Sequence, residues 1–325
     1  MTTLRLAPLA GITDWPFRLL CFEQGCGCAY TEMVSAMGYV YAPKQRAIVD
    51  LLLRDSREPR LILQLFGKDP ALMEKAAGIL SETGRFEGID INMGCPAHKV
   101  AASGEGSGLM RQPELAREIL THVVRASAVP VSVKMRLGWD EEHINVVDMA
   151  RMAEDCGVTE ITVHGRTKVQ MYGGQADWGW IARVKEAVRV PVTGNGDIFT
   201  AEEALQKLEQ SHVDGLMLAR GALGNPWLFR QIRDAMEGRP VVKPTLREVL
   251  DTLTRHYDML LSWKPEHIAV SEMRKHIAWY LHGVRGAAQI RNRVNTMQSP
   301  DEVKALLWSL LDDTDSRREE TADAQ

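Results

Sequence analysis

Eight short apolar segments, each followed by an amphipathic helical segment or a crossover, fill the chain from its start to about residue 238. The strand candidates are 4–8, 28–32, 61–66, 88–92, 129–135, 160–164, 190–195 and 214–219. The main helix candidates are 70–82, 113–126, 146–156, 178–188, 201–209 and 226–236. These strands are too uniformly apolar for a sheet with one face in water, so we expect both faces to be covered.

This alternation predicts an α/β fold, a parallel (β/α)8 TIM barrel over residues 1–238. An open doubly wound sheet usually has a glycine-rich dinucleotide turn after its first strand, whereas this chain has Pro8-Leu9-Ala10-Gly11. Strand patterns stop after the linker 238–244, and residues 245–311 have helical periodicity throughout. The sequence therefore predicts a small all-helical domain at 245–311, followed by a disordered acidic tail at 312–325.

The charge of the chain is unevenly distributed. The net charge is −4, yet residues 239–297 hold ten Lys/Arg against five Asp/Glu, and residues 299–325 hold three against eight. A basic segment between acidic neighbours is typical of a surface that contacts a polyanion. Within the helical domain the candidate contacts with such a polyanion are Arg274, Lys275, Arg291 and Arg293.

Composition argues against several other classes of protein. The five cysteines are scattered and none has zinc-site spacing, so we expect neither a disulfide framework nor a metal site. No apolar run approaches the roughly 20 residues of a membrane helix, and the N-terminus lacks the pattern of a signal peptide. We therefore expect a cytoplasmic protein without a membrane partner, and a monomer.

Polar residues stand at nearly every strand end. Because the active site of a (β/α)8 barrel lies at the carboxyl ends of its strands, these residues are expected to share one face. They are Glu32, Gln64, Asn92, Lys134 with Arg136, His164, Asn195-Gly196-Asp197 and Ala219-Arg220-Gly221. A lone amide or histidine there is often only structural, but so many together indicate a polar ligand.

The last two strand ends suit a phosphate. Such barrels commonly bind phosphate after strands seven and eight, where this chain has 194–197 and 219–221. Glycine lets the backbone approach an anion, and Arg220 supplies charge-assisted hydrogen bonds. Arg166, in the segment 164–167, is a further candidate.

Cys95 lies on a loop just past the fourth strand, over the expected barrel mouth. The residues after it, 97–108, are small and glycine-rich and are expected to form a mobile lid. A cysteine here serves either as a nucleophile paired with His98 or His164, or as a proton donor. The second role needs only a protonated thiol, the usual form of cysteine at pH 7.

Seven strings of the chain resemble the tRNA-dihydrouridine synthases, in the order and spacing of that family, over about residues 4–297. They are Ala7-Pro-Leu-Ala-Gly-Ile-Thr-Asp14, Gln64-Leu-Phe-Gly67, Asn92-Met-Gly-Cys-Pro96, Val133-Lys-Met-Arg-Leu-Gly-Trp139, His164-Gly-Arg-Thr167, Asn195-Gly-Asp197 and Arg220-Gly-Ala-Leu-Gly-Asn-Pro-Trp227. The string Met273-Arg-Lys-His-Ile-Ala-Trp-Tyr-Leu281 makes the bacterial B type the best match.

The resemblance implies FMN at the barrel mouth, NADPH (or NADH) as reductant and tRNA as substrate. It implies that Pro8, Leu9 and Ala10 contact the isoalloxazine, and that Gln64 and Lys134 bond its polar edge. It assigns the ribityl chain and phosphate to His164, Asn195, Gly196, Asp197, Ala219 and Arg220. Cys95 would protonate C5 of a D-loop uridine, Asn92 would bind the uracil, and Arg136 is a further candidate for contact with the substrate or RNA. Leu9, Thr193-Gly194 and Ala219 depart from the usual family residues, but conservatively.

Two other functions compete with this one. An FMN barrel reductase of a free small molecule, of the dihydroorotate or enoate type, shares the barrel but has no need of a basic helical domain. An RNA-binding protein with a vestigial flavin site would not need Cys95, Lys134 and Arg220 together.

Overall fold

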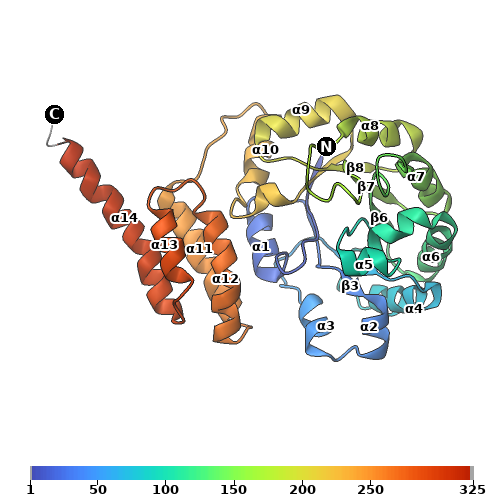
Figure 1. Cartoon of the computed structure of the whole chain (residues 1–325), viewed down its shortest axis with the longest axis horizontal. Helices are drawn as coiled ribbons and strands as arrows, with labels where there is room; N and C mark the ends of the chain where they lie inside the picture. Colours follow the sequence, from blue (N-terminus) through green and yellow to red (C-terminus); the bar gives the residue numbers. More distant parts are fainter. Residues whose placement is uncertain (1, 323–325) are drawn as a thin grey trace. The chain divides into compact units, whose positions relative to one another are not determined.

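The structure, a computed structural model, describes the backbone of residues 2–322 and the side chains of residues 2–311. It divides into two compact units, one of residues 1–221 and 228–239 and one of residues 222–227 and 240–325. The first unit contains all the strands described below and the second contains four helices (Figure 1). None of the helices in the described part of the chain is long and apolar enough to cross a membrane.

Eight parallel strands close into a barrel, which confirms the predicted fold class. They are β1 (Thr3–Leu6), β2 (Cys28–Tyr30), β4 (Leu61–Phe66), β5 (Gly88–Met93), β6 (Val131–Arg136), β7 (Glu160–His164), β8 (Val192–Asn195) and β9 (Gly215–Leu218). Each strand pairs with the next, and β1 also pairs with β9, which closes the ring. A short strand, β3 (Val34–Ser35), pairs further along β4 than β2 does, so the second wall of the barrel is interrupted.

Helices surround the barrel (Figure 1). They are α1 (Trp15–Glu23), α2 (Ala36–Tyr41), α3 (Arg46–Leu51), α4 (Pro70–Ser81), α5 (His98–Ala102), α6 (Pro113–Ala126), α7 (Val146–Asp155), α8 (Trp178–Ala187), α9 (Ala201–Ser211) and α10 (Leu228–Met236), with 3-10 turns at Gly106–Arg111 and Arg220–Ala222. Their starts follow from capping chemistry. Asp69 accepts a hydrogen bond from Leu72 N before Pro70, and Thr200 forms a capping box with Glu203.

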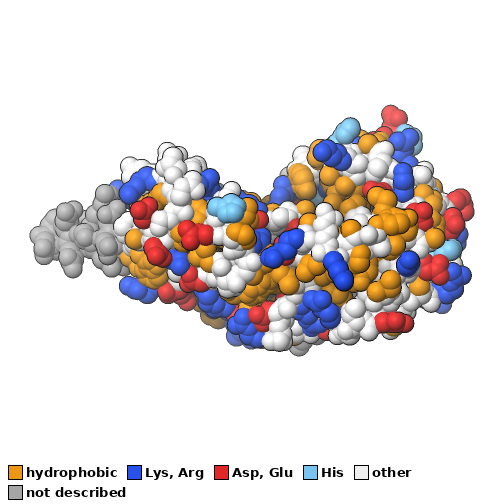
Figure 2. Space-filling model, turned by 90° about the horizontal axis from the view of Figure 1, so that it is seen from below, with side chains coloured by type: hydrophobic (Ala, Val, Ile, Leu, Met, Phe, Trp, Pro, Cys, Tyr) orange, Lys and Arg blue, Asp and Glu red, His pale blue; other side chains and the backbone are white. Residues whose placement is uncertain are grey.

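Helices α2 and α3 are elements that the periodicity did not reveal. Each has only six residues, and several large apolar side chains on them are exposed, including Met37, Tyr41 and Val49. Figure 2 looks from the side where Figure 1 has α2 and α3, and shows hydrophobic side chains gathered there with Lys and Arg among them. Because so few side chains of these two helices are buried, the sequence shows no periodic pattern of apolar residues there.

The second unit consists of α11 (Leu246–Leu261), α12 (Glu266–Tyr280), α13 (Ala287–Val294) and α14 (Pro300–Ala322). Its core includes Leu253, Tyr257, Met273 and Leu307, all fully buried. The backbone of α14 continues as helix to Ala322, where the sequence predicts disorder from residue 312; residues 323–325 lie outside the described residues. No Pro or Gly follows Pro300, so no residue breaks the helix there.

Two histidines pack against each other in the core of the helical unit. The rings of His256 (α11) and His276 (α12) lie 4.5 Å apart in edge-to-face contact, and both are buried. Burial, and then the charges of Lys264 and Lys275, lower the pKa of His256 to about 3. Burial, and then His256, lower the pKa of His276 well below its usual value. Both rings are therefore neutral in the folded protein at pH 7.

This pair predicts acid sensitivity. An unfolded histidine takes up a proton near pH 6.5 while these two do not, so stability falls as the pH drops below about 6.5, by roughly 1.4 kcal/mol per histidine per pH unit. Urea unfolding followed by circular dichroism at pH 7.5 and 5.5 measures it. His256→Gln is expected to remove one histidine's share of the pH dependence, whereas His267→Gln, at an exposed position of α12, leaves it unchanged. An unaltered pH dependence in His256→Gln would contradict the prediction.

Candidate active site at the mouth of the barrel

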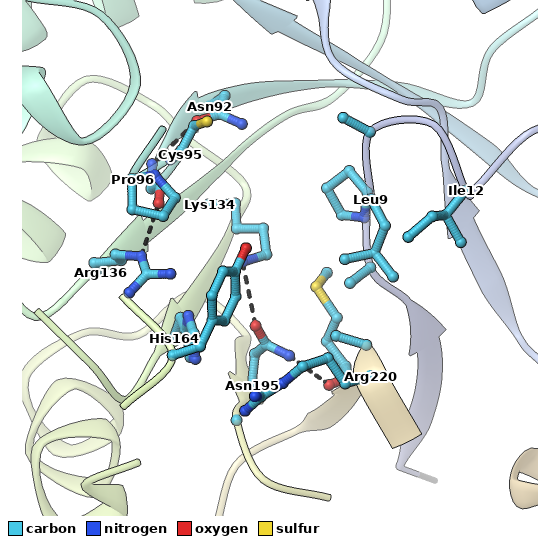
Figure 3. A pocket seen from close by; sticks show the side chains of 18 of the residues that line it. Leu9, Ile12, Asn92, Cys95, Pro96, Lys134, Arg136, His164, Asn195 and Arg220 are labelled. Atoms are coloured by element: carbon cyan, nitrogen blue, oxygen red, sulfur yellow. Dashed lines mark hydrogen bonds between the residues drawn. The ribbon is translucent and has the colours of Figure 1, made fainter. Parts of the chain in front are cut away.

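A cavity of about 380 Å³ opens at the carboxyl ends of the strands, a size usual for a small-molecule or cofactor site. Fourteen of the predicted site residues line it: Pro8, Leu9, Ala10, Gln64, Asn92, Cys95, Lys134, Arg136, His164, Asn195, Gly196, Asp197, Ala219 and Arg220. Figure 3 shows Leu9 and Ile12 on one side of it, Cys95 and Arg136 on the other, and Asn195 near Arg220. The predicted convergence of the strand ends on one cavity is thus present.

One wall of the cavity is apolar and rigid. After β1 the chain turns so that Leu9 N donates to Thr13 Oγ1 at 2.9 Å, and Thr13 Oγ1 donates back to Leu9 O at 3.2 Å. Leu9 and Ala219 pack against a buried cluster that contains Ala7 and Met217. A flat aromatic ring can therefore lie on this wall without meeting an unpaired polar group.

Cys95 is held by its backbone from two directions. Asn92 Oδ1 accepts from Cys95 N at 2.9 Å and from Gly94 N at 3.2 Å. On the other side, Ser107 Oγ and Ser107 N both donate to Cys95 O, at 2.8 and 3.1 Å. Gly106 has a φ of +56°, and a Cβ there would lie 3.0 Å from Cys95 Cβ, so glycine is required beside the cysteine.

The segment that follows Cys95, which is predicted to be a mobile lid, has regular secondary structure. Residues 97–108 run through α5 and into a 3-10 turn, and Gly106–Met110 are buried. The hydrogen bonds of Ser107 to Cys95 O tie the end of this segment to the Cys95 loop. Among the described residues, neither His98 nor His164 forms a hydrogen bond with Cys95 Sγ, so the geometry gives no support to a Cys–His nucleophile.

Lys134 and His164 sit deeper in the mouth. Lys134 Nζ donates to Asn195 Oδ1 at 3.2 Å, and Asn195 Nδ2 donates to Met217 O at 2.7 Å. Burial, and then the charge of Arg136, lower the pKa of Lys134 to about 8, which leaves it a cation at pH 7. Burial among cations, first Arg136 and then Lys134, lowers the pKa of His164 well below its usual value. His164 is therefore a neutral ring that can donate or accept one hydrogen bond.

Arg136 holds two loops together. Its Nε donates to Gly94 O at 2.9 Å, and its Nη1 donates to Thr167 O and Met171 O, both at 2.8 Å. The side chain is almost fully buried, and burial lowers its pKa to about 10. Arg136 thus fixes the Cys95 loop against the loop after β7. Its predicted contact with the substrate stays a prediction.

Asp197 joins two arginines at the far end of the cavity. Its carboxylate accepts from Arg166 Nη1 and Nη2 at 2.9 and 2.7 Å, from Ala176 N at 2.7 Å and from Arg220 Nη2 at 3.0 Å. Although burial raises the pKa of Asp197, these hydrogen bonds and charges outweigh it and lower the pKa. Arg166 is fully committed to Asp197 and to Gly173 O and Gly174 O, so the suggestion that it binds a phosphate is not supported.

Arg220 is the cation that lines this end of the cavity. It is 38% exposed and lies over the rings of Tyr172 and Phe199 at 5.2 and 5.7 Å. Beside it, Gly196 has a φ of +131°, and a Cβ there would lie 2.6 Å from Ala176 Cβ. The backbone at Gly196 is therefore not covered by a side chain, and it lies next to the guanidinium of Arg220. Backbone N–H groups and a guanidinium are the donors that bind a phosphate. The residues present fit a flavin mononucleotide, with an apolar wall for the ring and this end for the phosphate.

The predicted RNA contacts lie in the helical unit. Arg291 and Arg293 are exposed on α13. Arg274 on α12 is half-buried and donates to Met297 O at 3.1 Å, so it also ties α12 to the end of α13. Lys275 is half-buried on α12. Their roles toward RNA stay predictions.

Sequence reasoning missed Asp90, Ser107, Tyr172 and Phe199. Asp90 did carry a signal, because it is a lone carboxylate inside the apolar strand β5 and is fully buried. Ser107, Tyr172 and Phe199 had none, since Ser107 lies in a 3-10 turn, the other two lie in loops, and the paths of these segments depend on tertiary contacts. Within the described residues no group of His, Cys, Asp and Glu could hold a metal ion.

Comparison with known proteins identifies relatives of this chain. The family model described as Dihydrouridine synthase (Dus) matches residues 5–314. The "Probable tRNA-dihydrouridine synthase" of Rickettsia conorii is 41% identical over 300 residues, which cover 92% of this chain and 90% of that protein. The "tRNA-dihydrouridine synthase B" of Pseudomonas aeruginosa is 40% identical over 299 residues, or 92% of this chain and 89% of that one.

Solved structures share the barrel at low identity. Histamine dehydrogenase from Rhizobium sp. 4-9 superposes with a TM-score of 0.55 at 13% identity, over 79% of this chain and 48% of that chain. Likeness at this identity shows the fold alone. The sequence relatives carry the assignment, and through the family model, which spans nearly the whole chain, this protein belongs to the dihydrouridine synthase family.

Proposed function

We propose that this protein reduces a D-loop uridine of tRNA to 5,6-dihydrouridine, with FMN as its cofactor and NADPH as reductant. One observation carries the proposal. In a member of the dihydrouridine synthase family, Cys95 lies at a cavity whose other walls offer an apolar face and an end lined by Gly196 and Arg220. The proposal places the reaction in the cytoplasm, and a monomer remains our expectation.

The residues proposed to bind the cofactor form two groups, one for the ring and one for the ribityl chain and phosphate. Pro8, Leu9 and Ala10 would contact the isoalloxazine face, and Gln64 and Lys134 would bond its polar edge. His164, Asn195, Gly196, Asp197, Ala219 and Arg220 would surround the ribityl chain and the phosphate, with Asp197 acting by orienting Arg220. When bound, reduced FMN supplies a hydride to C6 of the uracil ring.

Cys95 would supply the matching proton. Addition of hydride at C6 leaves negative charge that a proton at C5 removes, so the two additions together saturate the C5–C6 double bond. A positioned acid contributes typically 10²–10⁴-fold to such a step. Asn92 keeps the backbone of Cys95 in place, and its own predicted role is to bind the uracil.

Binding of tRNA would require the target uridine to leave its stack and the RNA phosphates to meet exposed cations. A uridine in folded tRNA must leave its stack to enter the cavity. Phosphate contacts dominate RNA affinity, and Arg291 and Arg293 are exposed cations in the basic segment 239–297. Arg274 and Lys275 are weaker candidates because both are half-buried.

The test is reduction of defined substrates by the purified, FMN-loaded protein with NADPH. Unmodified tRNA is expected to gain dihydrouridine, whereas free uracil, orotate and a simple enone are expected to be poor oxidants of the reduced protein. Mapping dihydrouridine in tRNA from cells lacking the protein identifies the position. A protein that cannot be loaded with FMN, or one that turns over only a free small molecule, would refute the proposal.

A further inference from the structure

Asp90 lies at the centre of a hydrogen-bonded row across three strands. In the parallel register Gln64 on β4 pairs with Asp90 on β5, and Asp90 pairs with Ser132 on β6. Side chains at paired positions of neighbouring strands share a face of the sheet. Gln64 Nε2 donates to Asp90 Oδ2 and Ser132 Oγ donates to Asp90 Oδ1, both at 2.7 Å.

An ionised carboxylate in this position can only accept hydrogen bonds. Asp90 is fully buried, and burial raises its pKa to about 6, against the opposing effects of Gln64, Ser132 and Lys134. At neutral pH and above it therefore remains mostly ionised. Gln64 must then turn its NH₂ group, and not its oxygen, toward Asp90.

The orientation of the Gln64 amide determines that of Asn92 and so affects the Cys95 loop. With its NH₂ group on Asp90, Gln64 presents Oε1 to Asn92 Nδ2 at 2.8 Å. Asn92 must then present Oδ1 to the loop, where it accepts from Cys95 N and Gly94 N. A flipped Asn92 would place an NH₂ group against two N–H donors, which would leave those donors without a bond.

We propose that Asp90 is a positioning residue for the reaction, because it sets the amide orientations of Gln64 and Asn92 and thereby aims the Cys95 loop. The inference rests on the proposed function in assigning the proton transfer to Cys95. Asp90 itself does not line the cavity. Asp90 acts on Cys95 through the amides of Gln64 and Asn92. Each amide has the same shape in either orientation, so hydrogen bonding selects the orientation.

Three variants distinguish the effect of Asp90 on the amide orientations from the effects of its packing and of its charge. Asp90→Leu keeps the approximate size but removes the acceptor. Asp90→Asn keeps an acceptor for Gln64 because the hydroxyl of Ser132 can reverse and accept from the new NH₂ group. Thr162→Val is the matched control, since Thr162 is buried on the neighbouring strand β7 and its hydroxyl has no hydrogen-bond partner among the described residues.

Steady-state uridine reduction is the first measurement. Asp90→Leu is expected to lower kcat about 100-fold with little change in KM for tRNA, the loss typical of an ångström-scale misplacement. Flavin reduction by NADPH at saturating FMN is expected to stay near that of the wild type, whereas FMN affinity falls at most several-fold, because Gln64 is only one of the residues proposed to bond the flavin. Asp90→Asn is expected to keep kcat within about fivefold, since the amide row survives, and Thr162→Val to match the wild type.

Alkylation of Cys95 by iodoacetamide is the second measurement, followed by mass spectrometry of its peptide, and it needs neither tRNA nor turnover. Asp90→Leu is expected to change this rate several-fold, because the loop loses an acceptor, while Asp90→Asn and Thr162→Val keep it. If Asp90→Leu does not fold, Asp90→Ser replaces it, because a short hydroxyl selects no amide orientation.

Several results would overturn the role of Asp90. Asp90→Leu could keep full kcat and the normal alkylation rate. Flavin reduction at saturating FMN could fall as far as uridine reduction, which would make Asp90 a residue of the flavin site or of the fold. The kcat of Asp90→Asn could fall as far as that of Asp90→Leu, which would mean that the charge of Asp90, and not the amide orientations, causes the loss. If the wild type makes no dihydrouridine, the proposed function fails, and the alkylation rates still decide whether Asp90 positions the Cys95 loop.

Discussion

Cys95→Ala is expected to lower the rate of uridine reduction by 10²–10⁴-fold, typical of the loss of a positioned general acid. Reduction of the bound flavin by NADPH is expected to continue at the wild-type rate, since that step needs no proton from Cys95. Asn92 and Ser107 hold the backbone of residue 95 and not its sulfur, so the loop keeps its shape in the variant. Single-turnover assays with NADPH alone, and then with tRNA, separate the two steps.

The matched control is Cys156→Ala. Cys156 is also a free, partly exposed thiol, but it lies at the end of α7 beside Thr121 and Arg117 on the outside of the barrel. Its replacement is expected to change neither step. If Cys95→Ala slowed flavin reduction as much as uridine reduction, the residue would serve the flavin or the fold, and the proton donor would have to be sought elsewhere.

Asp197→Asn is expected to destabilise the barrel by about 3–5 kcal/mol, the usual cost of leaving a buried cation without its partner. Arg166 is 1% exposed, and Asp197 is the carboxylate that pairs with it. The backbone is not the cause of the loss, because Asp197 has a φ of +48° and asparagine tolerates this region as well as aspartate does. Urea unfolding of the apoprotein measures the effect without any contribution from cofactor.

Asp148→Asn makes the same chemical change on the surface. Asp148 is 85% exposed and lies 3.9 Å from Arg151, so its replacement is expected to change stability by at most about 0.5 kcal/mol. Asp197→Asn is also expected to weaken FMN binding, because Arg220 loses the carboxylate that orients it. Equal stabilities for the two variants would mean that the Arg166 pair contributes nothing to the fold.

The barrel was predictable because its strands carry their signal locally. A buried parallel strand is a short apolar run between turn residues, and the predicted strands 61–66 and 160–164 coincide with β4 and β7. The strand ends then place residues such as Gln64 and Asn195 on one face by geometry alone. Helices α2 and α3 lacked such a signal because few of their side chains are buried.

The contacts within the site could not be predicted from the sequence in the same way. The pairing of Gln64 with Asp90 depends on the register between two strands, which the sequence does not state. The ion pair of Arg166 with Asp197 joins residues 31 positions apart on different loops. The sequence identified Gln64, Arg166 and Asp197 as polar site residues but not Asp90, and tertiary structure decides whether each of them faces the ligand or another side chain.

The charges around the barrel mouth nearly cancel once a phosphate is added. Among the residues that line the cavity, three cations oppose one carboxylate: Lys134, Arg136 and Arg220 against Asp197. The excess of two positive charges is close to the −1.5 to −2 of a phosphate monoester at pH 7. A flavin-loaded mouth would therefore exert little electrostatic pull on RNA approaching through solution. Long-range steering, and with it the dependence of the association rate on ionic strength, would have to come from basic surface elsewhere on the molecule.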